Sequence, residues 1–505
     1  MAKVTLDIDL NLVEGDLELQ VDLEDGVIVD ARCIGTLYRG FEQILIGRAP
    51  LDPLVITPRI CGICGTAHLY AAVLALEQLG GIRPSEQAAH IRNLCLMAET
   101  LQSDLRQTFL FFTPDLCHPR YAGHPMAEEI VGAFAPFKGS VARGCLAISR
   151  KVVEIVAIFG GQWPHSTYML PGGVVQPANR RRLLETGDII ASTRAWFEEA
   201  VLGDDLEAWL ALDGADAFFA WLEAGRAHAD GALGRLTRFA RSIGLHRIGR
   251  GSGHLLSYGV NPRPDGTHGG MPAGFYDADA GRVESLDHLR VNEHVRHSWF
   301  RNYAGGKHPW DGETIPDYQP GQQRYTWAKA PRYGDKVAQT GPLAELRVAG
   351  DPLIAELLDR EGDNTWLRQF ARLRRAAWTL KAMADTLAAL GQVLDQAHYT
   401  DPAIKDWPDG DSYGLVEAAR GALGHWLRVR NGVIDRYQIV TPTAWNASPR
   451  DSGDQPGHWE RSLIGLRIDD PDDPVEVGHI VRSHDPCLVC TVHFLGSRKK
   501  HRFHV

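Results

Sequence analysis

The feature that most constrains this chain is a pair of Cys-x-x-Cys motifs placed near its two ends. Cys61 and Cys64 lie in the segment Arg-Ile-Cys-Gly-Ile-Cys, and Cys487 and Cys490 lie in Asp-Pro-Cys-Leu-Val-Cys. Four thiolates that meet in one site form a donor set that suits a soft transition metal. A fold that closes such a site has to bring both ends of the polypeptide together.

Composition excludes several classes of protein. The 505 residues are 44% hydrophobic and 23% charged, and the net charge of -10 argues against nucleic acid as a partner. Eight cysteines are too few for a disulfide scaffold of this size, so we expect reduced thiols and a cytoplasmic location. No apolar run reaches the roughly 20 residues of a membrane span, and the first residues do not resemble a signal peptide.

The hydrophobic pattern predicts a mainly α (α+β) fold. Alternating apolar residues indicate a β-rich segment over residues 1–60, with Asp25-Gly26 at a turn, and a second hairpin is expected near 414–442 around Asn431-Gly432. Between them we expect a helical bundle core over 61–400, with long helical stretches near 85–112, 126–159, 178–200, 216–243 and 364–396. The stretch 250–340 has little periodicity and is expected to be irregular. We treat 1–505 as a single domain, with 401–493 holding the hairpin, two short helices and the C-terminal metal-ligand segment.

Taken alone, each cysteine pair has simpler explanations. A Cys-x-x-Cys can be a structural zinc knuckle or a redox dithiol. Zinc knuckles usually assemble from nearby residues, whereas most of the chain separates these pairs. Each pair also has ionisable neighbours, Arg59 and His68 around the first and Asp485 and His493 around the second. Such neighbours favour proton handling and tuning of the site over a purely structural role.

Together the two motifs resemble the paired signatures of the large subunit of nickel-iron hydrogenases. The resemblance extends over most of the chain, and only the irregular middle is weakly covered. Further matching segments are Val13-Glu14-Gly15, Arg39-Gly40-Phe41-Glu42, Pro164-His165-Ser166, Pro171-Gly172-Gly173, Glu417-Ala-Ala-Arg420-Gly421, Pro442-Thr443-Ala-Trp445-Asn446 and Pro449-Arg450-Asp451.

The resemblance implies a role for each cysteine. Cys61 and Cys487 would be terminal nickel ligands, while Cys64 and Cys490 would bridge nickel to an iron that carries cyanide and carbon monoxide. Cys487 would accept the first proton from dihydrogen, and Glu14 would carry it outward if burial raises its pKa. Read without the family, Glu14 is a turn acid in a hairpin.

Other residues acquire roles through the same resemblance. Arg420 would lie over the metals, Thr443 would hydrogen-bond a cyanide, and Asp104 and Asp485 would orient the arginine. The segment around Asp104 lacks the histidines that are usual in the family. The remaining implied residues are Glu42, the carbonyl of Ile439 and His493 as ligands of Mg²⁺, and His68 and Arg59 as residues that surround the ligands.

The chain also departs from the family pattern. Ile63 is bulkier than the usual Val, and Phe111 or Phe112 falls where a smaller residue would line the gas route. Bulky side chains there would slow dioxygen more than dihydrogen, which is typical of the oxygen-insensitive uptake and sensing branch. Ordinary core packing is the alternative explanation for these aromatic residues.

The resemblance also implies partners. A maturation endopeptidase would remove the tail 494–505 after nickel loading, and the presence of this tail favours an uptake enzyme. Two electrons have to leave the site, yet the remaining Cys33, Cys95, Cys117 and Cys145 lack the close spacing of an iron-sulfur cluster. We therefore expect an obligate heterodimer with an iron-sulfur small subunit, which would dock through an apolar interface near the first cysteine pair.

Three other functions stay open at this stage. The first is a hydrogen sensor that signals to a kinase. The second is a non-catalytic relative, like the quinone-site subunit of respiratory complex I, although all four cysteines are retained here. The third is a structural zinc protein, which metal analysis would identify.

Overall fold

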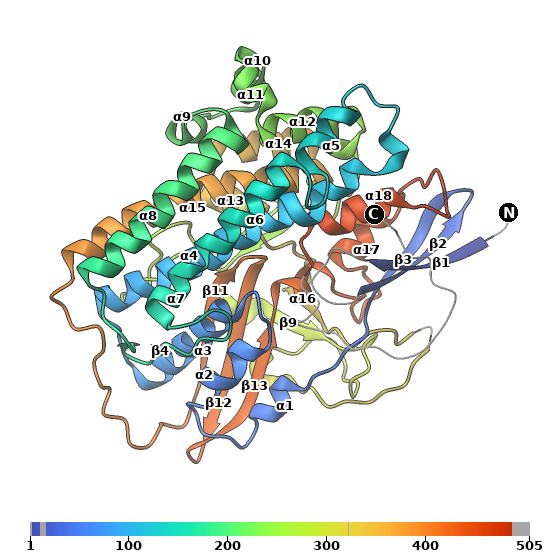
Figure 1. The fold of residues 1–505 in the computed structure, drawn as a ribbon. Helices are drawn as coiled ribbons and strands as arrows, with labels where there is room; N and C mark the ends of the chain where they lie inside the picture. The colour runs from blue at the N-terminus through green and yellow to red at the C-terminus, as the bar shows by residue number, and fades with distance from the viewer. Residues whose placement is uncertain (1–2, 11–16, 322, 487–505) are drawn as a thin grey trace.

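The computed structural model describes residues 3–10, 17–321 and 323–486. A layer of long helices lies over a three-stranded sheet, and small sheets and loops surround the junction (Figure 1). The mainly α fold with small antiparallel sheets at the N-terminus and near residues 414–442 is confirmed.

The helical layer is organised around two long, buried helices. Helix α15 (Thr365–Gln392) packs along α4 (Glu86–Arg106), with α6 (Ser140–Val152) and α8 (Arg180–Trp196) beside them. Side-chain caps define their starts, because Ser85 accepts a hydrogen bond from the Ala88 amide and Asn364 accepts one from the Leu367 amide. Helix α4 continues as a π-helix over Gln107–Phe112, so the segment 85–112 is helical throughout, as predicted.

Two of the expected helical stretches are divided. The stretch 216–243 breaks at Gly225 and Gly231, whose extended backbones interrupt the helical hydrogen bonds. Its pieces are α10 (Ala215–Ala224), α11 (Arg226–Asp230) and α12 (Ala232–Ser242). The stretch 126–159 is divided into α5 (Ala127–Phe134), α6 and α7 (Glu154–Gly160). The outer layer is completed by a π-helix over Phe197–Leu202, α9 (Leu206–Leu210), α13 (Pro342–Ala349) and α14 (Pro352–Glu361).

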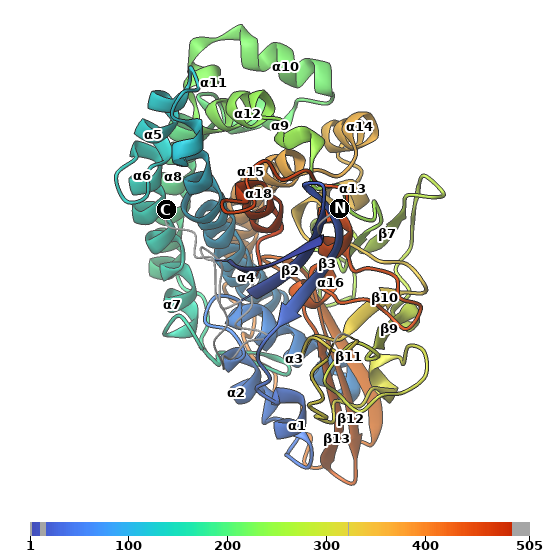
Figure 2. The same cartoon turned by 90° about the vertical axis from the view of Figure 1, so that its right-hand side faces the viewer.

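The N-terminal sheet is antiparallel in the order β1 (Lys3–Leu10), β2 (Leu17–Glu24) and β3 (Val27–Gly35). Asp25 and Gly26 form the predicted turn, both with positive φ. The sheet is held to a distant region of the chain, since the Ile28 amide donates to the Leu466 carbonyl at 2.9 Å. The amino-terminal sheet and the C-terminal segment are therefore neighbours (Figure 2).

The central sheet consists of β11 (Gly410–Ala418), β12 (Gly421–Arg430) and β13 (Val433–Val440), all antiparallel. Asn431 and Gly432 form the turn that was predicted between its last two strands. Helix α3 (Gly65–Gly80) crosses β11 closely: a Cβ on Gly414 would lie 1.9 Å from the Ala71 carbonyl oxygen. This close approach fixes the first cysteine pair, which precedes α3, against the central sheet.

The middle of the chain has more structure than the sequence pattern indicated. It contains a three-stranded sheet, β6 (Leu255–Ser257), β7 (Gly274–Asp277) and β8 (Arg282–Glu284), and a pair, β9 (Val291–His294) with β10 (Ala330–Tyr333). These strands are short and joined by Gly- and Pro-rich loops, so they leave little periodicity in the sequence. Elsewhere lie the short elements α1 (Phe41–Leu45), α2 (Pro53–Ile56), β4 (Met169–Leu170) and β5 (Gly173–Val174).

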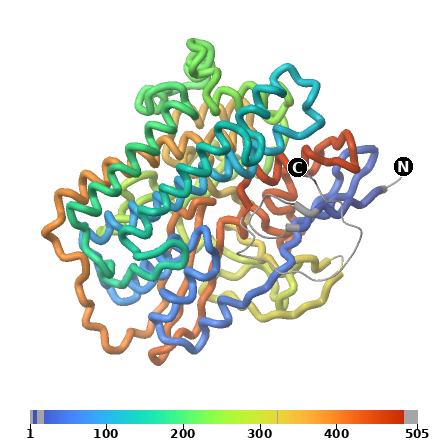
Figure 3. The backbone as a smooth tube through the Cα atoms, viewed as in Figure 1, coloured from blue at the N-terminus to red at the C-terminus, as the bar shows by residue number. Residues whose placement is uncertain are grey.

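Up to Pro486, the end of the described chain, three helices rather than the two expected follow the central sheet. They are α16 (Pro442–Asn446), α17 (His458–Leu463) and α18 (Val475–Ser483). Helix α17 packs against β3, and α18 packs against α15. The tube in Figure 3 shows this red segment between the blue N-terminal sheet and the helical layer.

Candidate metal centre

The first cysteine pair lies in a tight turn at the start of α3. Cys61 is 1% exposed and Cys64, the N-cap of the helix, is 6% exposed. The backbone amides of Ile63 and Cys64 donate to the Cys61 sulfur at 3.3 and 3.4 Å. These amides hold the Cys61 sulfur in a fixed position, and cysteine sulfur is the donor that a soft metal prefers.

A buried glutamate fixes the first turn of α3. Glu99 of α4 accepts hydrogen bonds from the amides of Thr66 and Ala67 at 3.1 and 3.2 Å. Burial raises the pKa of Glu99 to about 7, although these donors and the Trp163 indole act in the opposite direction. Glu99 was not predicted from the sequence, because an isolated Glu inside a helical pattern carries no functional signal.

A small enclosed cavity opens beside Cys64. It is lined by residues from α3, from the turn between β11 and β12, and from α16, and these are Cys64, His68, Ala418, Arg420, Leu423, Thr441, Pro442 and Thr443. The structure therefore brings together four of the predicted site residues: Cys64, His68, Arg420 and Thr443. A soft sulfur donor, a fixed guanidinium and a hydroxyl on one wall form a set that fits a metal with anionic ligands.

Arg420 is held by the C-terminal segment. Its Nε donates to Asp485 Oδ1 at 3.1 Å, and both side chains are almost fully buried. The turn that carries Arg420 is tight, because Gly421 has φ 124° and a Cβ there would lie 2.4 Å from the Gly341 amide nitrogen. The segment just before the second cysteine pair is thus placed beside the cavity that contains Cys64.

The second cysteine pair follows this segment directly. Cys487, Cys490 and His493 lie outside the described residues, as does Glu14, so their predicted roles stay predictions. The proposed tail 494–505 also lies outside them. The last described residue is Pro486, next to Asp485.

Among the described residues Asp104 is connected to Arg420 only through intermediate ion pairs, and its predicted role in orienting that arginine stays a prediction. Asp104 is fully buried, and its carboxylate pairs with Arg372 at 2.8 Å and with Arg375 at 3.0 Å. Arg372 also contacts Asp485 at 3.1 Å. Asp104 thus connects to Arg420 through Arg372 and Asp485, and no direct pair of Asp104 with Arg420 is found in the described region of the chain.

These arginines form a row on α15. Arg368, Arg372 and Arg375 follow a spacing of four and three, so they lie on one helix face. Arg368 extends the row to the Ser483 hydroxyl at 3.3 Å. A second carboxylate, Asp115, anchors the same segment through an ion pair with Arg482 in α18. These residues were not predicted, because buried arginines resemble surface arginines in a helical sequence pattern.

His68 begins a buried chain of hydrogen bonds that leads away from the cavity. Its Nδ1 lies 3.0 Å from His425 Nε2, and His425 Nδ1 lies 2.8 Å from the Tyr437 hydroxyl. Burial lowers the pKa of His425 well below its usual value, so this imidazole is neutral. Arg59 has another environment: it is exposed and donates to the Val55 carbonyl at the surface.

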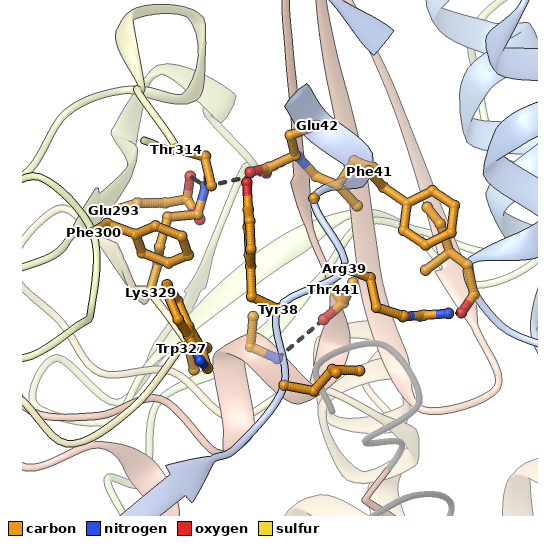
Figure 4. A pocket seen from close by; sticks show the side chains of 16 residues that line it. Tyr38, Arg39, Phe41, Glu42, Glu293, Phe300, Thr314, Trp327, Lys329 and Thr441 are labelled. Carbon is orange, nitrogen blue, oxygen red and sulfur yellow. Dashed lines mark hydrogen bonds and ion pairs between the residues drawn. The ribbon is translucent and has the colours of Figure 1, made fainter. Parts of the chain in front are cut away.

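A second pocket contains two of the three residues expected to bind magnesium, Glu42 and Ile439, while His493 lies outside the described residues. Glu42 of α1 accepts a hydrogen bond from the Ile439 amide at 2.9 Å, and Figure 4 shows Glu42 facing Lys329 across the pocket. Lys329 Nζ lies 2.7 Å from Glu293, 2.7 Å from Gln438 Oε1 and 3.2 Å from Glu42. The pocket contains carboxylate oxygens, which are ligands that suit a hard cation, together with the ammonium group of Lys329.

The lysine and its partners shift each other's protonation. Burial and the nearby Glu42 raise the pKa of Glu293, while Lys329 opposes this shift. Glu293 and Glu42 raise the pKa of Lys329 against the effect of burial, so the ammonium stays charged. Lys329 and Glu293 were not predicted, because they lie in the weakly patterned middle of the chain.

The predicted gas-route residues lie in ordinary apolar packing. Phe112 is fully buried and Phe111 is partly buried in the π-helix that follows α4. Ile63 is partly buried and packs against the main core. Their effect on gas access stays a prediction.

The comparisons with known proteins agree on one family. The model of the nickel-dependent hydrogenase family matches residues 39–112 and 238–493. The periplasmic [NiFeSe] hydrogenase large subunit of Desulfomicrobium baculatum is 35% identical over 98% of this chain and 95% of its own length. The hydrogenase-1 large chain of Escherichia coli is 29% identical over 96% of this chain and 94% of its own length.

Solved structures show the same similarity. The H2-activated [NiFeSe] hydrogenase of Dm. baculatum superimposes with a TM-score of 0.81 at 31% identity, covering 97% of this chain and 100% of that chain. The enzyme from D. vulgaris Hildenborough has a TM-score of 0.82 at 28% identity, with coverage of 97% and 100%. This chain belongs to the nickel-dependent hydrogenases as a large subunit.

The family membership decides between the alternatives left open by the sequence. The catalytic function, cleavage of dihydrogen by a hydrogenase large subunit, is confirmed at this level, and the structural zinc protein and the metal-free relative are not supported. The relatives named above are hydrogenase large chains, so the sensing function is not favoured either. Among the described helices, none has the length and apolar character needed to cross a bilayer.

Proposed function

We propose that this chain is the large subunit of an uptake hydrogenase that cleaves dihydrogen heterolytically at a nickel-iron centre in the cavity beside Cys64. The observation that carries this proposal is that one cavity unites Cys64, near one end of the chain, with Arg420, which Asp485 holds from the other end. When bound, the nickel-iron group supplies the site where dihydrogen is split into protons and electrons. Cys61, Cys64, Cys487 and Cys490 would be its ligands.

The residues around the cavity have separable tasks. Arg420 would present a fixed cation to the reacting molecule, and together with the Thr443 hydroxyl it would hydrogen-bond cyanide ligands of the iron. Asp485 would keep the guanidinium in place, since it accepts from Arg420 Nε and its other oxygen contacts Arg372. Cys487 would receive the first proton and Glu14 would move it outward. Glu42, the Ile439 carbonyl and His493 would bind Mg²⁺, and carbon monoxide would complete the iron ligands.

The electrons would leave through an iron-sulfur small subunit. Apolar side chains are exposed on and after α1 and on α2, directly before the first cysteine pair, and they are Ile44, Ile46, Leu51 and Val55. Exposed apolar residues clustered in this way are typical of a protein interface. A partner docked there would lie close to Cys61, which shortens the electron path.

Finer properties follow from the sequence rather than from the geometry. We propose a cytoplasmic, oxygen-insensitive enzyme in which Ile63, Phe111 and Phe112 narrow the gas route. We also propose that an endopeptidase removes residues 494–505 after nickel loading. Intact-mass measurement of the active protein tests the last point, and an active form that keeps Phe494 to Val505 would contradict it.

One experiment tests the proposed function as a whole. The chain is produced with its small subunit and maturation system, and the complex is analysed for nickel and iron, for infrared bands of iron-bound cyanide and carbon monoxide, and for reduction of a dye under H2. We expect nickel, these bands and dye reduction together. Zinc at one per chain without nickel, or the absence of dye reduction in a nickel-loaded complex, would overturn the proposal.

A further inference from the structure

A second small cavity adjoins the metal pocket, and Ala418 lines both. Its wall contains two glutamates, Glu345 and Glu417, together with Arg375 and Asn261. Glu417 lies near the end of β11, Glu345 in the first turn of α13 and Arg375 on α15, so three elements converge here (Figure 1). The side chains of this cluster are buried, with Glu345 1% and Glu417 5% exposed.

The two glutamates differ in how the protein compensates their negative charge. Glu345 forms an ion pair with Arg375, which also binds Asp104. Glu417 accepts a hydrogen bond from the Tyr258 amide at Oε1, whereas its Oε2 receives no hydrogen bond from a donor group of the described residues. Glu417 has no ion pair of its own among the described residues, and a buried carboxylate without one is destabilising, so the protonated form of Glu417 is favoured.

The side chains of Glu345 and Glu417 interact as hydrogen-bond partners, and a hydrogen bond between two carboxyl groups requires a proton on one of them. Burial raises the pKa of Glu417 well above its usual value, and the neighbouring Glu345 adds to the rise. For Glu345, burial and Asp104 raise the pKa while Arg375 and the bond to Glu417 lower it. Both pKa shifts agree with a protonated Glu417 that donates a hydrogen bond to an ionised Glu345. This arrangement places one proton on the pair, in the manner of carboxylate dyads.

A second unsatisfied acceptor faces the same cavity. The side-chain oxygen of Asn261 is buried and, within the described chain, has no donor. Buried polar groups are almost always satisfied by protein or by ordered water, so a donor belongs in this cavity. The outer wall is formed by Thr100, Val260 and Trp378, which are only partly buried. The cavity thus lies between the metal pocket and the surface.

We propose that Glu417 and Glu345 form a proton relay that connects the metal pocket with solvent through the cavity bounded by Asn261 and Trp378. The proposal rests on the proposed function, because the protons are those that dihydrogen cleavage releases. One proton enters the pair from the side of Ala418, and the proton already on Glu417 leaves to water at the outer wall. The pair returns to its singly protonated state, and the electrons depart separately through the small subunit.

The charged groups around the pair determine its response to pH. Arg375 faces it from α15 and Asp104 from α4, and the Tyr258 amide faces it from the loop after β6. Arg375 also donates to the Ala419 carbonyl, one residue before Arg420. The pair therefore responds to the charge state of the metal pocket through fixed contacts.

The test uses the holoenzyme with its small subunit. Infrared difference spectra are recorded in H2O and D2O, because a protonated carboxyl group has a carbonyl band that shifts on deuteration. We expect such a band in the native complex, its loss in Glu417→Gln, and a shift of the band in Glu345→Gln. A native complex without this band would overturn the proposal, whatever the variants do.

Turnover gives the second readout. Glu417→Gln should lower kcat for H2 oxidation by about 10²-fold or more, the range expected for a lost acid-base step, and change its solvent isotope effect. Glu361→Gln, which alters a carboxylate paired with Arg241 in the outer helical layer, is the matched control and should leave kcat unchanged. Equal kcat for Glu417→Gln and the native complex would contradict the proposed relay without affecting the proposed function. A native complex that oxidises no H2 would remove the proposed function itself.

Discussion

Two buried charge clusters of this molecule solve the same electrostatic problem differently. The arginine cluster, Asp104, Arg372, Arg375, Arg420 and Asp485, joins α4, α15 and the C-terminal segment beside the metal pocket. The lysine cluster, Glu42, Glu293, Lys329 and Gln438, lines the pocket of Figure 4. Both are buried, yet only the first is rich in cations.

The difference lies in how the charges are fixed. Arginine stays charged under all conditions and binds carboxylates through a rigid fork, so the arginine cluster keeps its geometry. In the lysine cluster one ammonium faces two carboxylates, so one negative charge remains in excess. Such an excess can be relieved by protonation of Glu293 or by a bound cation. The first cluster suits permanent positioning, and the second suits a site that exchanges protons or metal ions.

The largest expected effect is on H2 oxidation and concerns the guanidinium group of Arg420. Arg420→Lys keeps the charge but removes the planar donor group, so we expect H2 oxidation to fall by about 10²-fold or more. Nickel content and the infrared bands of the iron ligands should stay close to native. Arg428→Lys, which alters an arginine near the far end of β12, the strand that follows Arg420, is the control. An Arg420→Lys complex with more than half of the native activity would show that positive charge alone suffices.

The next effect concerns stability. Arg372→Met leaves Asp104 and Asp485 without a shared partner, and breaking a buried ion pair in this way costs about 3–5 kcal/mol. We expect a clear drop in the urea concentration at the midpoint of unfolding. Arg181→Met removes an arginine that is 86% exposed and paired with Glu185, and should shift the midpoint very little. Equal shifts for the two variants would contradict the permanent role of the arginine cluster.

A smaller and pH-dependent effect is expected for the lysine cluster. Lys329→Met removes the only cation of this cluster among the described residues, so the loss of stability should be largest at pH 8, where Glu293 is ionised. Near pH 5.5 the loss should shrink, because Glu293 binds a proton instead. Thermal unfolding at the two pH values measures the difference. A loss that is the same at both values would show that the excess negative charge is compensated in another way.

The sequence predicted the regions of this fold that carry a periodic signal. The N-terminal sheet, the turn at Asn431-Gly432 and the long helix over Thr365–Gln392 were all expected, because alternation, turn residues and helical spacing are local properties. The short strands between 255 and 333 were missed, since their pairing depends on contacts across Gly- and Pro-rich loops. The predicted helical stretch 216–243, which divides at Gly225 and Gly231, shows the same limit.

The residues of the candidate site also separate into those with a local sequence signal and those without one. Residues inside distinctive motifs, such as Cys64, Arg420 and Thr443, converge on one cavity as the resemblance implied. Residues that act through tertiary contacts, such as Arg372, Lys329 and Glu99, have no motif and were not found. Asp104 illustrates the difference: the resemblance implied that it orients Arg420, and its ion pairs with Arg372 and Arg375, which make any such effect indirect, carry no signal in the sequence.

The smallest expected effect is that of Glu293→Gln. This variant tests the difference between the two clusters directly, because it removes a single protonation site from the lysine cluster. Burial raises the pKa of Glu293 from 4.5 to about 7 in the folded protein. An acid whose pKa is higher in the folded state contributes most stability below its unfolded pKa, and this contribution is lost as pH rises through the folded value. The stability of the native chain should therefore decline between about pH 4.5 and 7 through this group. In Glu293→Gln that component is absent, so the curve should be flatter in the same window.

The comparison of the two curves isolates Glu293 from other buried acids. Glu99 and Glu460 also have pKa values raised to about 7, so both proteins share their contributions and the difference cancels them. Urea midpoints measured from pH 4.5 to 8 give the two curves. Parallel curves would mean that Lys329 keeps Glu293 ionised throughout, in which case the lysine cluster would be as permanent as the arginine cluster and the excess charge would belong to a bound cation instead.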